Sequence, residues 1–213
     1  MRKPFFIAKQ GRKPSGLLGK LVAHIMAKET ADENAFALKL LQLQPEDAVL
    51  EIGCGHGQTL AKAAGFVQRG RLCGIDFSPV MYRHAMRRHR QLVAAKRIEF
   101  HFGSSDRLPF DDQSFDKVFA VHTVYFWQTP LDHLAEARRV LKLQGRFVLG
   151  FRPAEDIGFQ ASFPREIYHI RPEAEIARLA AEAGFEVVDL RRYARGAVQM
   201  SFLIATRTLD KPA

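Results

Sequence analysis

Three alternating glycines follow a short apolar run near residue 50. The run, residues 48–52, stops at Gly53, Gly55 and Gly57, and a helix-competent segment, residues 58–67, comes next. Glycines let the backbone adopt positive φ and let a ligand approach closely, and a helix N-terminus offers unpaired N–H groups to polar ligand atoms. This order of strand, glycine turn and helix predicts an α/β domain that binds a nucleotide-like ligand.

An acidic residue ends the second apolar run. Asp76 lies 19 residues after Gly57, at the place where nucleotide-binding folds hold ribose hydroxyls with an acid. The glycines are spaced G-x-G-x-G, with Glu51 before them and His56 among them, whereas the dinucleotide fingerprint is G-x-G-x-x-G. The sequence therefore predicts an adenosine-containing cofactor and disfavours an NAD-dependent dehydrogenase.

Further motifs follow in a fixed order over residues 45–206. They are the glycine turn in 49–60, the second-strand motif in 74–81, the loop 103–116, the helix and glycine turn in 136–145, and the turn in 183–187. As a set they resemble the class I S-adenosylmethionine (SAM)-dependent methyltransferases, in the methyltransferase type 11 group that includes ubiquinone and menaquinone methyltransferases. The resemblance implies SAM as the cofactor and methyl transfer to a small-molecule acceptor as the function.

Short apolar runs alternate with amphipathic helices through the chain. This predicts a Rossmann-like α/β sheet, mostly parallel, with helices on both faces. The seven expected strands are residues 47–52, 71–76, 97–102, 115–121, 145–151, 185–192 and 198–206, and the helices are 58–67, 79–95, 130–141 and 172–183. The link between the last two strands is too short for a crossover helix, so we expect the last strand to be antiparallel.

Two parts are expected along the chain. Residues 1–44 form an N-terminal arm and helices that cover the site, with residues 1–15 as a loose arm and helices at 17–28 and 33–43. Residues 45–213 form the SAM-binding methyltransferase domain. The segment 151–171 is a long connection of the kind that serves as a lid or binding loop.

The resemblance also assigns the cofactor site. The glycine turn, with Gly53, Cys54, Gly55 and Gly57, would lie against the methionine part of SAM, with Glu51 near its amino group. Asp76 would accept hydrogen bonds from both ribose hydroxyls. Phe77 and Met81 would contact the adenine, or else only pack in the core, and Glu51 could instead cap the turn.

The adenine loop departs from the family pattern. The family usually has an aspartate directly after the glycine of this loop, and here that position is Ser104. Either the Ser104 hydroxyl or the Asp106 carboxylate would accept from the adenine amino group, and the backbone of Ser105 and Asp106 is a further candidate. A neutral hydroxyl is the weaker acceptor because its hydrogen bond is not charge-assisted.

The run of residues 122–127 follows the fourth predicted strand and is the candidate catalytic segment. His122 is a candidate general base and cofactor contact, and Tyr125 a second catalytic candidate. Tyr125 and Trp127 could also wall the pocket. The alternative is that His122 is a hydrogen-bonded structural residue and the aromatic side chains pack against a helix. Since the sulfonium already activates the methyl carbon, alignment is the main requirement, and a base is needed only for a protonated nucleophile.

The net charge of +9 raises the question of partners. Basic residues gather near the N-terminus and in residues 83–90, so a nucleic acid or an anionic membrane is an alternative to a small molecule, although a solvated helix face is favoured. A non-catalytic SAM-binding module is a further alternative. We expect no metal site and a cytoplasmic protein, because metal-ligand spacings, a signal-peptide core and an apolar run of about 18–20 residues are all missing.

Overall fold

A seven-stranded sheet with the order β3-β2-β1-β4-β5-β7-β6 forms the centre of the computed structural model, which describes residues 3–196 and 198–209. Its strands are β1 (Ala48–Ile52), β2 (Arg71–Asp76), β3 (Glu99–Phe102), β4 (Phe115–Val121), β5 (Leu141–Phe151), β6 (Phe185–Arg195) and β7 (Val198–Arg207). The pairings from β3 through β5 are parallel, and β7 is antiparallel to both β5 and β6. The predicted fold class is confirmed.

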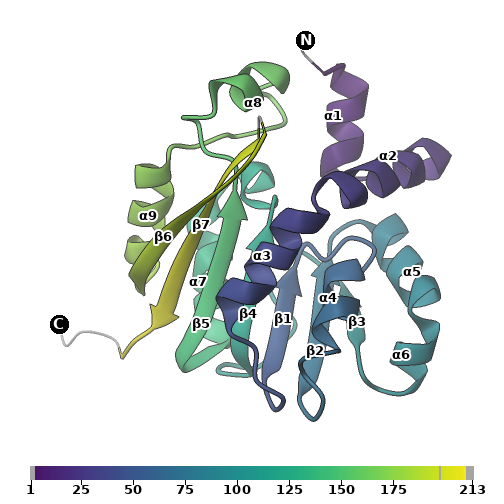
Figure 1. The fold of residues 1–213 in the computed structure, drawn as a ribbon, viewed down its shortest axis with the longest axis vertical. Coiled ribbons are helices and arrows are strands. Elements are labelled where there is room, and N and C mark those ends of the chain that lie inside the picture. The colour runs from purple at the N-terminus through teal and green to yellow at the C-terminus, as the bar shows by residue number, and fades with distance from the viewer. Residues whose placement is uncertain (1–2, 197, 210–213) are drawn as a thin grey trace.

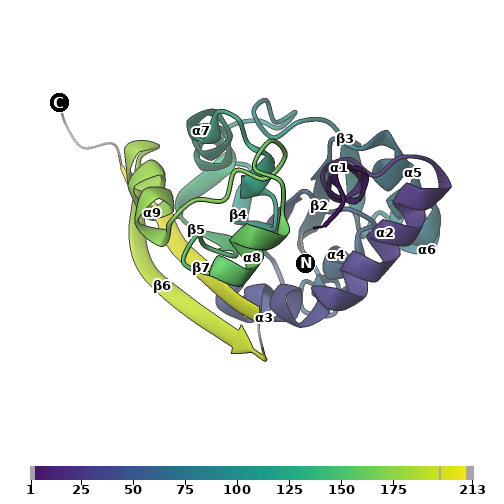
Figure 2. The same ribbon diagram turned by 90° about the horizontal axis from the view of Figure 1, so that it is seen from above.

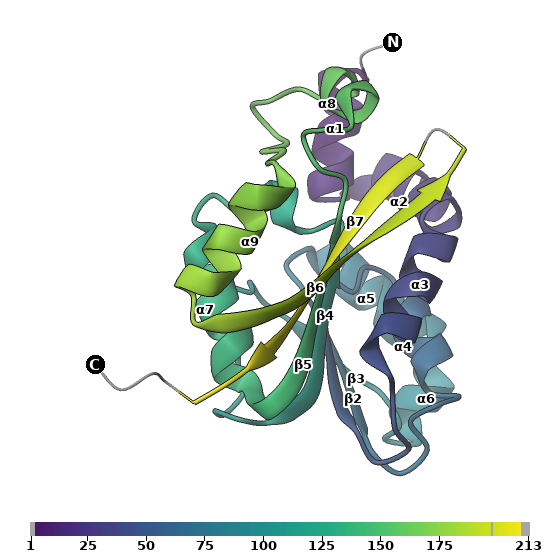
Figure 3. The ribbon, with the colours of Figure 1, turned by 60° about the vertical axis from the view of Figure 1, so that its left-hand side comes forward.

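Helices cover both faces of this sheet. They are α1 (Phe5–Arg12), α2 (Gly16–Glu29), α3 (Ala31–Leu41), α4 (Gln58–Ala63), α5 (Pro79–Arg88), α6 (Arg90–Ala94), α7 (Pro130–Val140), α8 (Ile157–Ser162) and α9 (Glu173–Glu182), with a 3₁₀ turn at Val124–Phe126. Figure 3 shows α7 and α9 on one face, with α3, α4 and α6 on the other. Each face has its own apolar cluster, which α7 and α9 close on one side and α3, α4 and α5 on the other.

The parallel strands end beneath the N-terminal helices. Figure 1 shows α1 and α2 above the carboxyl ends of β1 and β4, with α8 beside them. The same helices lie over the sheet in the view from above (Figure 2). Ligands of open α/β sheets bind outside the carboxyl ends of the strands, so these helices lie where they can enclose a ligand.

The expectation of a loose arm over residues 1–15 was wrong, because α1 is helical from Phe5 to Arg12. Ala8 is buried in the core, and Lys3 donates its backbone N–H to the carbonyl of Ser162. Gly11 reads as a helix breaker in the sequence. In the structure a Cβ at Gly11 would overlap the Tyr168 hydroxyl, so the glycine permits close packing inside the helix.

Several other elements differ from the predicted ones. The helix expected over residues 79–95 is divided at His89 into α5 and α6, and β5 begins at Leu141 instead of residue 145. The long connection contains a short helix, α8. In the part of the chain that the structure describes, no helix is long and apolar enough to cross a membrane.

Candidate functional site

Two adjoining cavities lie at the carboxyl ends of β1, β2 and β4. We call them the Ser104 cavity, of about 230 Å³, and the Glu51 cavity, of about 180 Å³. Both are lined by Arg12, Gly53, Asp76, Phe77, Thr123 and Phe126. Because they share these walls, they are the two halves of one cleft, and their combined size falls in the range of roughly 300–1,000 Å³ typical of small-molecule sites.

The glycine turn forms the floor between β1 and α4. Gly53, Gly55 and Gly57 have φ values of 72°, 54° and 77°, in the left-handed region that favours glycine. A Cβ at Gly53 would overlap the Thr123 methyl group, and one at Gly57 would collide with the Phe100 ring. Gly55 has open space beyond its Cα, on the cleft side. Gly57 lines neither cavity, so its role is to start α4.

Asp76 holds the turn and faces both halves of the cleft. One carboxylate oxygen accepts the N–H of Gly55 and the other accepts the N–H of Ser78, each at 2.8 Å. Burial raises the pKa of the Asp76 carboxyl, while these two N–H groups oppose that shift. Each carboxylate oxygen can accept a second hydrogen bond. Ser78, not Asp76, caps α5, because its hydroxyl accepts the Met81 N–H at 3.4 Å.

Glu51 lies at the inner end of the Glu51 cavity with an unsatisfied oxygen. The side chain is buried, and its Oε2 has no hydrogen-bond partner among the described residues. Burial raises the pKa of Glu51 to about 8, against the opposing hydrogen bonds of the Thr59 side chain and the Leu60 backbone. Cys54, Gly55 and Met81 line the same cavity. Met81 therefore lies in the half away from Ser104, whereas Phe77 lines both halves, and the adenine contact of each stays a prediction.

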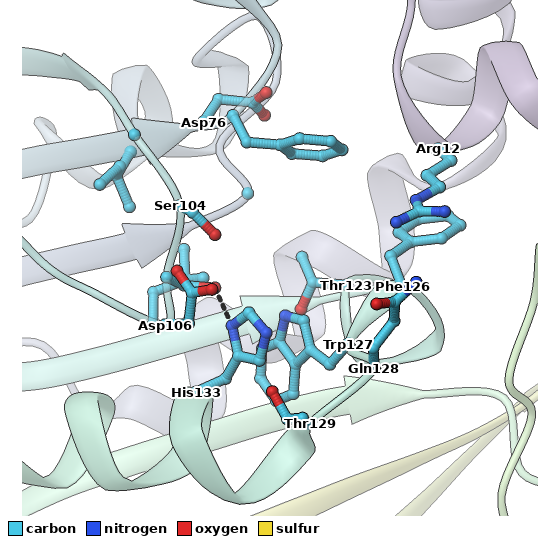
Figure 4. Close-up of a pocket in the computed structure, with 16 residues that line it drawn as sticks. Arg12, Asp76, Ser104, Asp106, Thr123, Phe126, Trp127, Gln128, Thr129 and His133 are labelled. Atoms are coloured by element: carbon cyan, nitrogen blue, oxygen red, sulfur yellow. Dashed lines mark hydrogen bonds between the residues drawn. The ribbon is translucent and has the colours of Figure 1, made fainter.

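Ser104, Ser105 and Asp106 all line the Ser104 cavity, as the loop motif predicts. The Ser105 hydroxyl is hydrogen-bonded to Nδ1 of His133 at 2.8 Å, and the His133 ring stacks on Trp127 at 4.9 Å between centroids. Figure 4 shows Ser104 and Asp106 facing the cleft beside His133, with Arg12 and Phe126 opposite. Both candidates for reading the adenine thus remain in reach of the same cavity.

His122 is the first residue after β4 and lines the Glu51 cavity. Its φ is 59°, uncommon for a residue with a Cβ, and its N–H is held by the Gly150 carbonyl at 2.9 Å. Nδ1 lies 3.2 Å from the Tyr125 hydroxyl, and Nε2 lies 3.6 Å from Oε2 of Glu33. That last separation is too long for a hydrogen bond, and neither Nε2 nor Oε2 has a hydrogen-bond partner within the described residues. A catalytic role for His122 stays a prediction.

Tyr125 requires a correction. Its side chain is 2% exposed, lies in the core cluster among Phe159 and Tyr168, and lines neither cavity. The hydroxyl accepts the Arg152 N–H at 2.5 Å, and burial raises the pKa of Tyr125 far above its usual range. The 3₁₀ turn directs this ring inward and leaves Phe126 and Trp127 on the cleft. Tyr125 supports His122 and does not face a ligand.

The sequence reasoning missed several cleft residues. Arg12 and Thr123 line both halves, His133 lines the Ser104 cavity, and Glu33 lies behind His122. Arg12 and Glu33 come from the N-terminal helices, outside every motif, so only the folded chain brings them to the site. Thr123 follows His122 directly. Its position just after a predicted strand was the one signal in the sequence that could have placed it at the cleft.

Residues 50–149 match the family described as a methyltransferase domain. These residues therefore form a methyltransferase domain of the class I SAM-dependent type. YrhH of Bacillus subtilis, a putative methyltransferase, is 35% identical over 109 residues, 51% of this chain and 59% of that protein. YdaC of the same organism, an uncharacterized methyltransferase, is 28% identical over 174 residues, 80% of this chain and 89% of that protein. The matches cover 46%, 59% and 53% of three curated relatives, about half of their length.

Solved structures show the same fold. A putative methyltransferase of Haloferax volcanii, in complex with the activator Trm112, superposes with a TM-score of 0.74 at 21% identity, over 88% of this chain and 95% of that one. A SAM-dependent methyltransferase of Aquifex aeolicus superposes with a TM-score of 0.69 at 21% identity, over 81% of this chain and 88% of that one. The cofactor of this methyltransferase family is SAM. Three features of the cleft fit SAM. The Oε2 of Glu51 lacks a hydrogen-bond partner and can accept from the amino group, and Asp76 can accept further hydrogen bonds from the ribose hydroxyls. The open space at Gly55 lets the cofactor lie directly against the backbone.

The predicted absence of a metal centre stays a prediction. Among the described residues, one group has metal-ligand spacing, namely Cys73, Glu99 and His101 on β2 and β3. It lies outside both cavities, and the Glu99 carboxylate is already paired with Arg71 at 2.9 Å. Asp112, in the turn before β4, pairs with Arg139, and Asp116 of β4 pairs with Lys142.

Proposed function

We propose that this methyltransferase transfers the methyl group of SAM to a small-molecule acceptor, mainly by aligning the two. The observation that carries the proposal is the shape of the Glu51 cavity. It runs from the glycine turn to Gly11, Met26, Thr30 and Asn34 of the N-terminal helices, so an acceptor can lie in the cleft beside the cofactor. A cleft of this size suits a small molecule better than a nucleic acid duplex or a membrane surface. Relatives include O-methyltransferase cnsE of Penicillium expansum and a demethylmenaquinone methyltransferase of Oceanobacillus iheyensis.

SAM supplies an electrophilic methyl group that needs no further activation. The contribution of the chain is then to bind and orient. Asp76 would hold the ribose, Glu51 the amino group, and Ser104 or Asp106 the adenine. The N-terminal helices would exclude water and hold the acceptor in line with the methyl group, which is a proximity effect.

Thermal unfolding followed by methyl transfer tests the proposal. A ligand at about 100 times its Kd stabilises by roughly 2.7 kcal/mol, which should raise Tm by about 5–10 °C for a chain of this size. We expect that shift with SAM and S-adenosylhomocysteine and none with NAD, followed by tritium transfer from labelled SAM to a metabolite fraction. Transfer to RNA or lipid vesicles instead would favour a macromolecular acceptor, and binding without any transfer would favour a non-catalytic module.

Glu51 gives the cofactor affinity a predictable pH dependence. An ammonium group beside Glu51 requires the ionised carboxylate, but the pKa of about 8 keeps most of it protonated below that pH. Binding must therefore release a proton, and we expect the affinity for S-adenosylhomocysteine to rise about tenfold per pH unit from pH 5.5 to 7.5. Calorimetry in buffers of different ionisation enthalpy measures both the affinity and the released proton.

The matched variant is Glu51→Gln, which should bind more weakly at pH 7.5 and show no such slope. The same raised pKa stabilises the free protein below pH 4.5, and this contribution is lost as pH rises through about 8. Glu51→Gln should therefore flatten the pH dependence of Tm as well. A steep slope that survives in the variant would place the linked proton on another group.

His122 and Glu33 would handle a proton if the acceptor arrives protonated. His122 lines the Glu51 cavity, and its Nε2 lies 3.6 Å from Oε2 of Glu33 behind it, so His122 would take the proton and Glu33 would stabilise the charged ring. General-base catalysis contributes about 10²–10⁴-fold, so His122→Gln and Glu33→Gln should each lower kcat by roughly 100-fold. Affinity for S-adenosylhomocysteine should change less than about threefold. Single-turnover transfer at full rate in either variant would leave alignment as the whole mechanism.

A further inference from the structure

Arg12 is the last residue of α1, and its side chain reaches the junction of the two cavities. It lines both of them, together with Phe126 and Phe77. Figure 4 shows the guanidinium on the side of the cleft opposite Asp76 and Ser104, near Phe126. The side chain is half-buried, so most of its surroundings are protein and the remainder is the cleft.

The backbone that carries Arg12 is fixed to the rest of the protein on three sides. The Pro14 carbonyl accepts the hydroxyl of Ser78, a fully buried residue, at 3.0 Å. The Gln10 side chain accepts the Ser15 N–H at 2.8 Å, and Gly11 lies against the Tyr168 hydroxyl without room for a Cβ. These contacts hold the backbone on both sides of Arg12, whose side chain lines both cavities.

Arg12 has no acidic partner. Within residues 3–196 and 198–209 it makes no ion pair or hydrogen bond, and Asp76, the acid that lines both cavities with it, lies on the opposite side of the cleft. Arg171 and Arg12 both lower the pKa of His169, after the larger effect of burial. Arg171 is paired with Glu175 at 3.2 Å, which leaves Arg12 uncompensated. A half-buried guanidinium favours an anion with two oxygens, because its fork of N–H groups matches carboxylate and phosphate geometry.

The methionine carboxylate of the cofactor has another candidate partner. Lys62 of α4 lines the Glu51 cavity beside the glycine turn, at the end where the methionine part is expected, and it does not line the Ser104 cavity. Arg12 instead lines both cavities, as does Phe126. An anion bound there would bring an apolar body against the aromatic wall.

Resting on the proposed function, we propose that Arg12 recognises an anionic oxygen group, a carboxylate or phosphate, on the methyl acceptor. The acceptor is then a small anionic molecule with an apolar part that contacts Phe126.

The test begins with a small-molecule extract divided by anion exchange into retained and unretained fractions. Each fraction is incubated with the protein and methyl-tritiated SAM, and soluble tritiated product is measured. We expect the acceptor in the retained fraction. An acceptor in the unretained fraction alone would overturn the inference and leave the methyltransferase proposal intact. SAM binding with no transfer from either fraction would overturn both.

Three variants separate the roles of Arg12. Arg12→Gln should lower transfer at limiting acceptor by roughly 10–100-fold, since a hydrogen-bonded charge pair is lost, and Arg12→Lys should fall between it and the parent. Lys9→Gln, the same charge change at an exposed site on α1, should transfer like the parent. In all three variants the affinity for S-adenosylhomocysteine and the Tm should equal those of the parent protein. Undiminished transfer by Arg12→Gln would overturn the inference, and so would a tenfold loss of S-adenosylhomocysteine affinity, which would assign Arg12 to the cofactor.

Discussion

Replacing Asp76 with alanine is expected to weaken S-adenosylhomocysteine binding by at least about 100-fold. The ribose would lose two hydrogen bonds to a charged acceptor, each contributing roughly 1.5–3 kcal/mol. The substitution also removes the acceptor for the N–H groups of Gly55 and Ser78, which hold the glycine turn beside β2. Isothermal titration calorimetry measures the affinity, and circular dichroism checks that the sheet still folds.

Two controls make the result specific. Asp111→Ala removes a carboxylate from an exposed turn and should bind like the parent. Asp76→Asn keeps one oxygen for the turn but loses the charge, so its Tm should lie nearer the parent while its affinity stays low. Binding of S-adenosylhomocysteine by Asp76→Ala at the parent's affinity would mean that the ribose is held elsewhere.

Gly53→Ala is expected to lower the free energy of unfolding of the ligand-free protein by roughly 2–5 kcal/mol. The alanine would have to adopt a φ near 72°, which costs about 1–2 kcal/mol, and its Cβ would overlap the Thr123 methyl group, which adds about 1–3 kcal/mol. Urea denaturation without ligand measures the change.

Gly55→Ala is the matched variant, since Gly55 also has positive φ but no atom within 4 Å of the added Cβ. It should lose only about 1–2 kcal/mol of stability. Its Cβ would enter the Glu51 cavity, so it should lose cofactor affinity out of proportion to that change. Equal stability losses in the two variants would show that the close contact between Gly53 and Thr123 is not maintained in solution.

The core of the fold could be predicted from the sequence because its signals are local. The apolar run before Gly53, the glycine spacing and Asp76 each lie within a few residues of the structure they specify, and all are where the motifs indicate. The loop with Ser104 and Asp106 lines the Ser104 cavity, and its contact with the adenine stays a prediction. Such features depend on backbone conformation and strand order, which the sequence pattern reflects directly.

Features that depend on long-range packing could not be predicted in this way. Helix α1 was missed because Gly11 reads as a breaker until the Tyr168 hydroxyl is seen against it. Tyr125 was assigned to the cleft because an aromatic run does not reveal which ring turns inward at the 3₁₀ turn. Arg12 and Glu33 reach the site only through the docking of the N-terminal helices, which no spacing in the sequence records.

The hydrogen bond from Ser78 to the Pro14 carbonyl joins the N-terminal helices to the residues that follow Asp76. Since Asp76, Phe77 and Ser78 are consecutive, undocking α1 and α2 disturbs the ribose site, and a ligand that holds this turn opposes undocking. Local opening of the N-terminal segment and occupancy of the cleft are therefore linked equilibria, and each changes the other by the same free energy. Amide exchange in α1 and α2 should consequently slow as the cleft fills, so the exchange rate of these helices measures how much of the protein has cofactor bound.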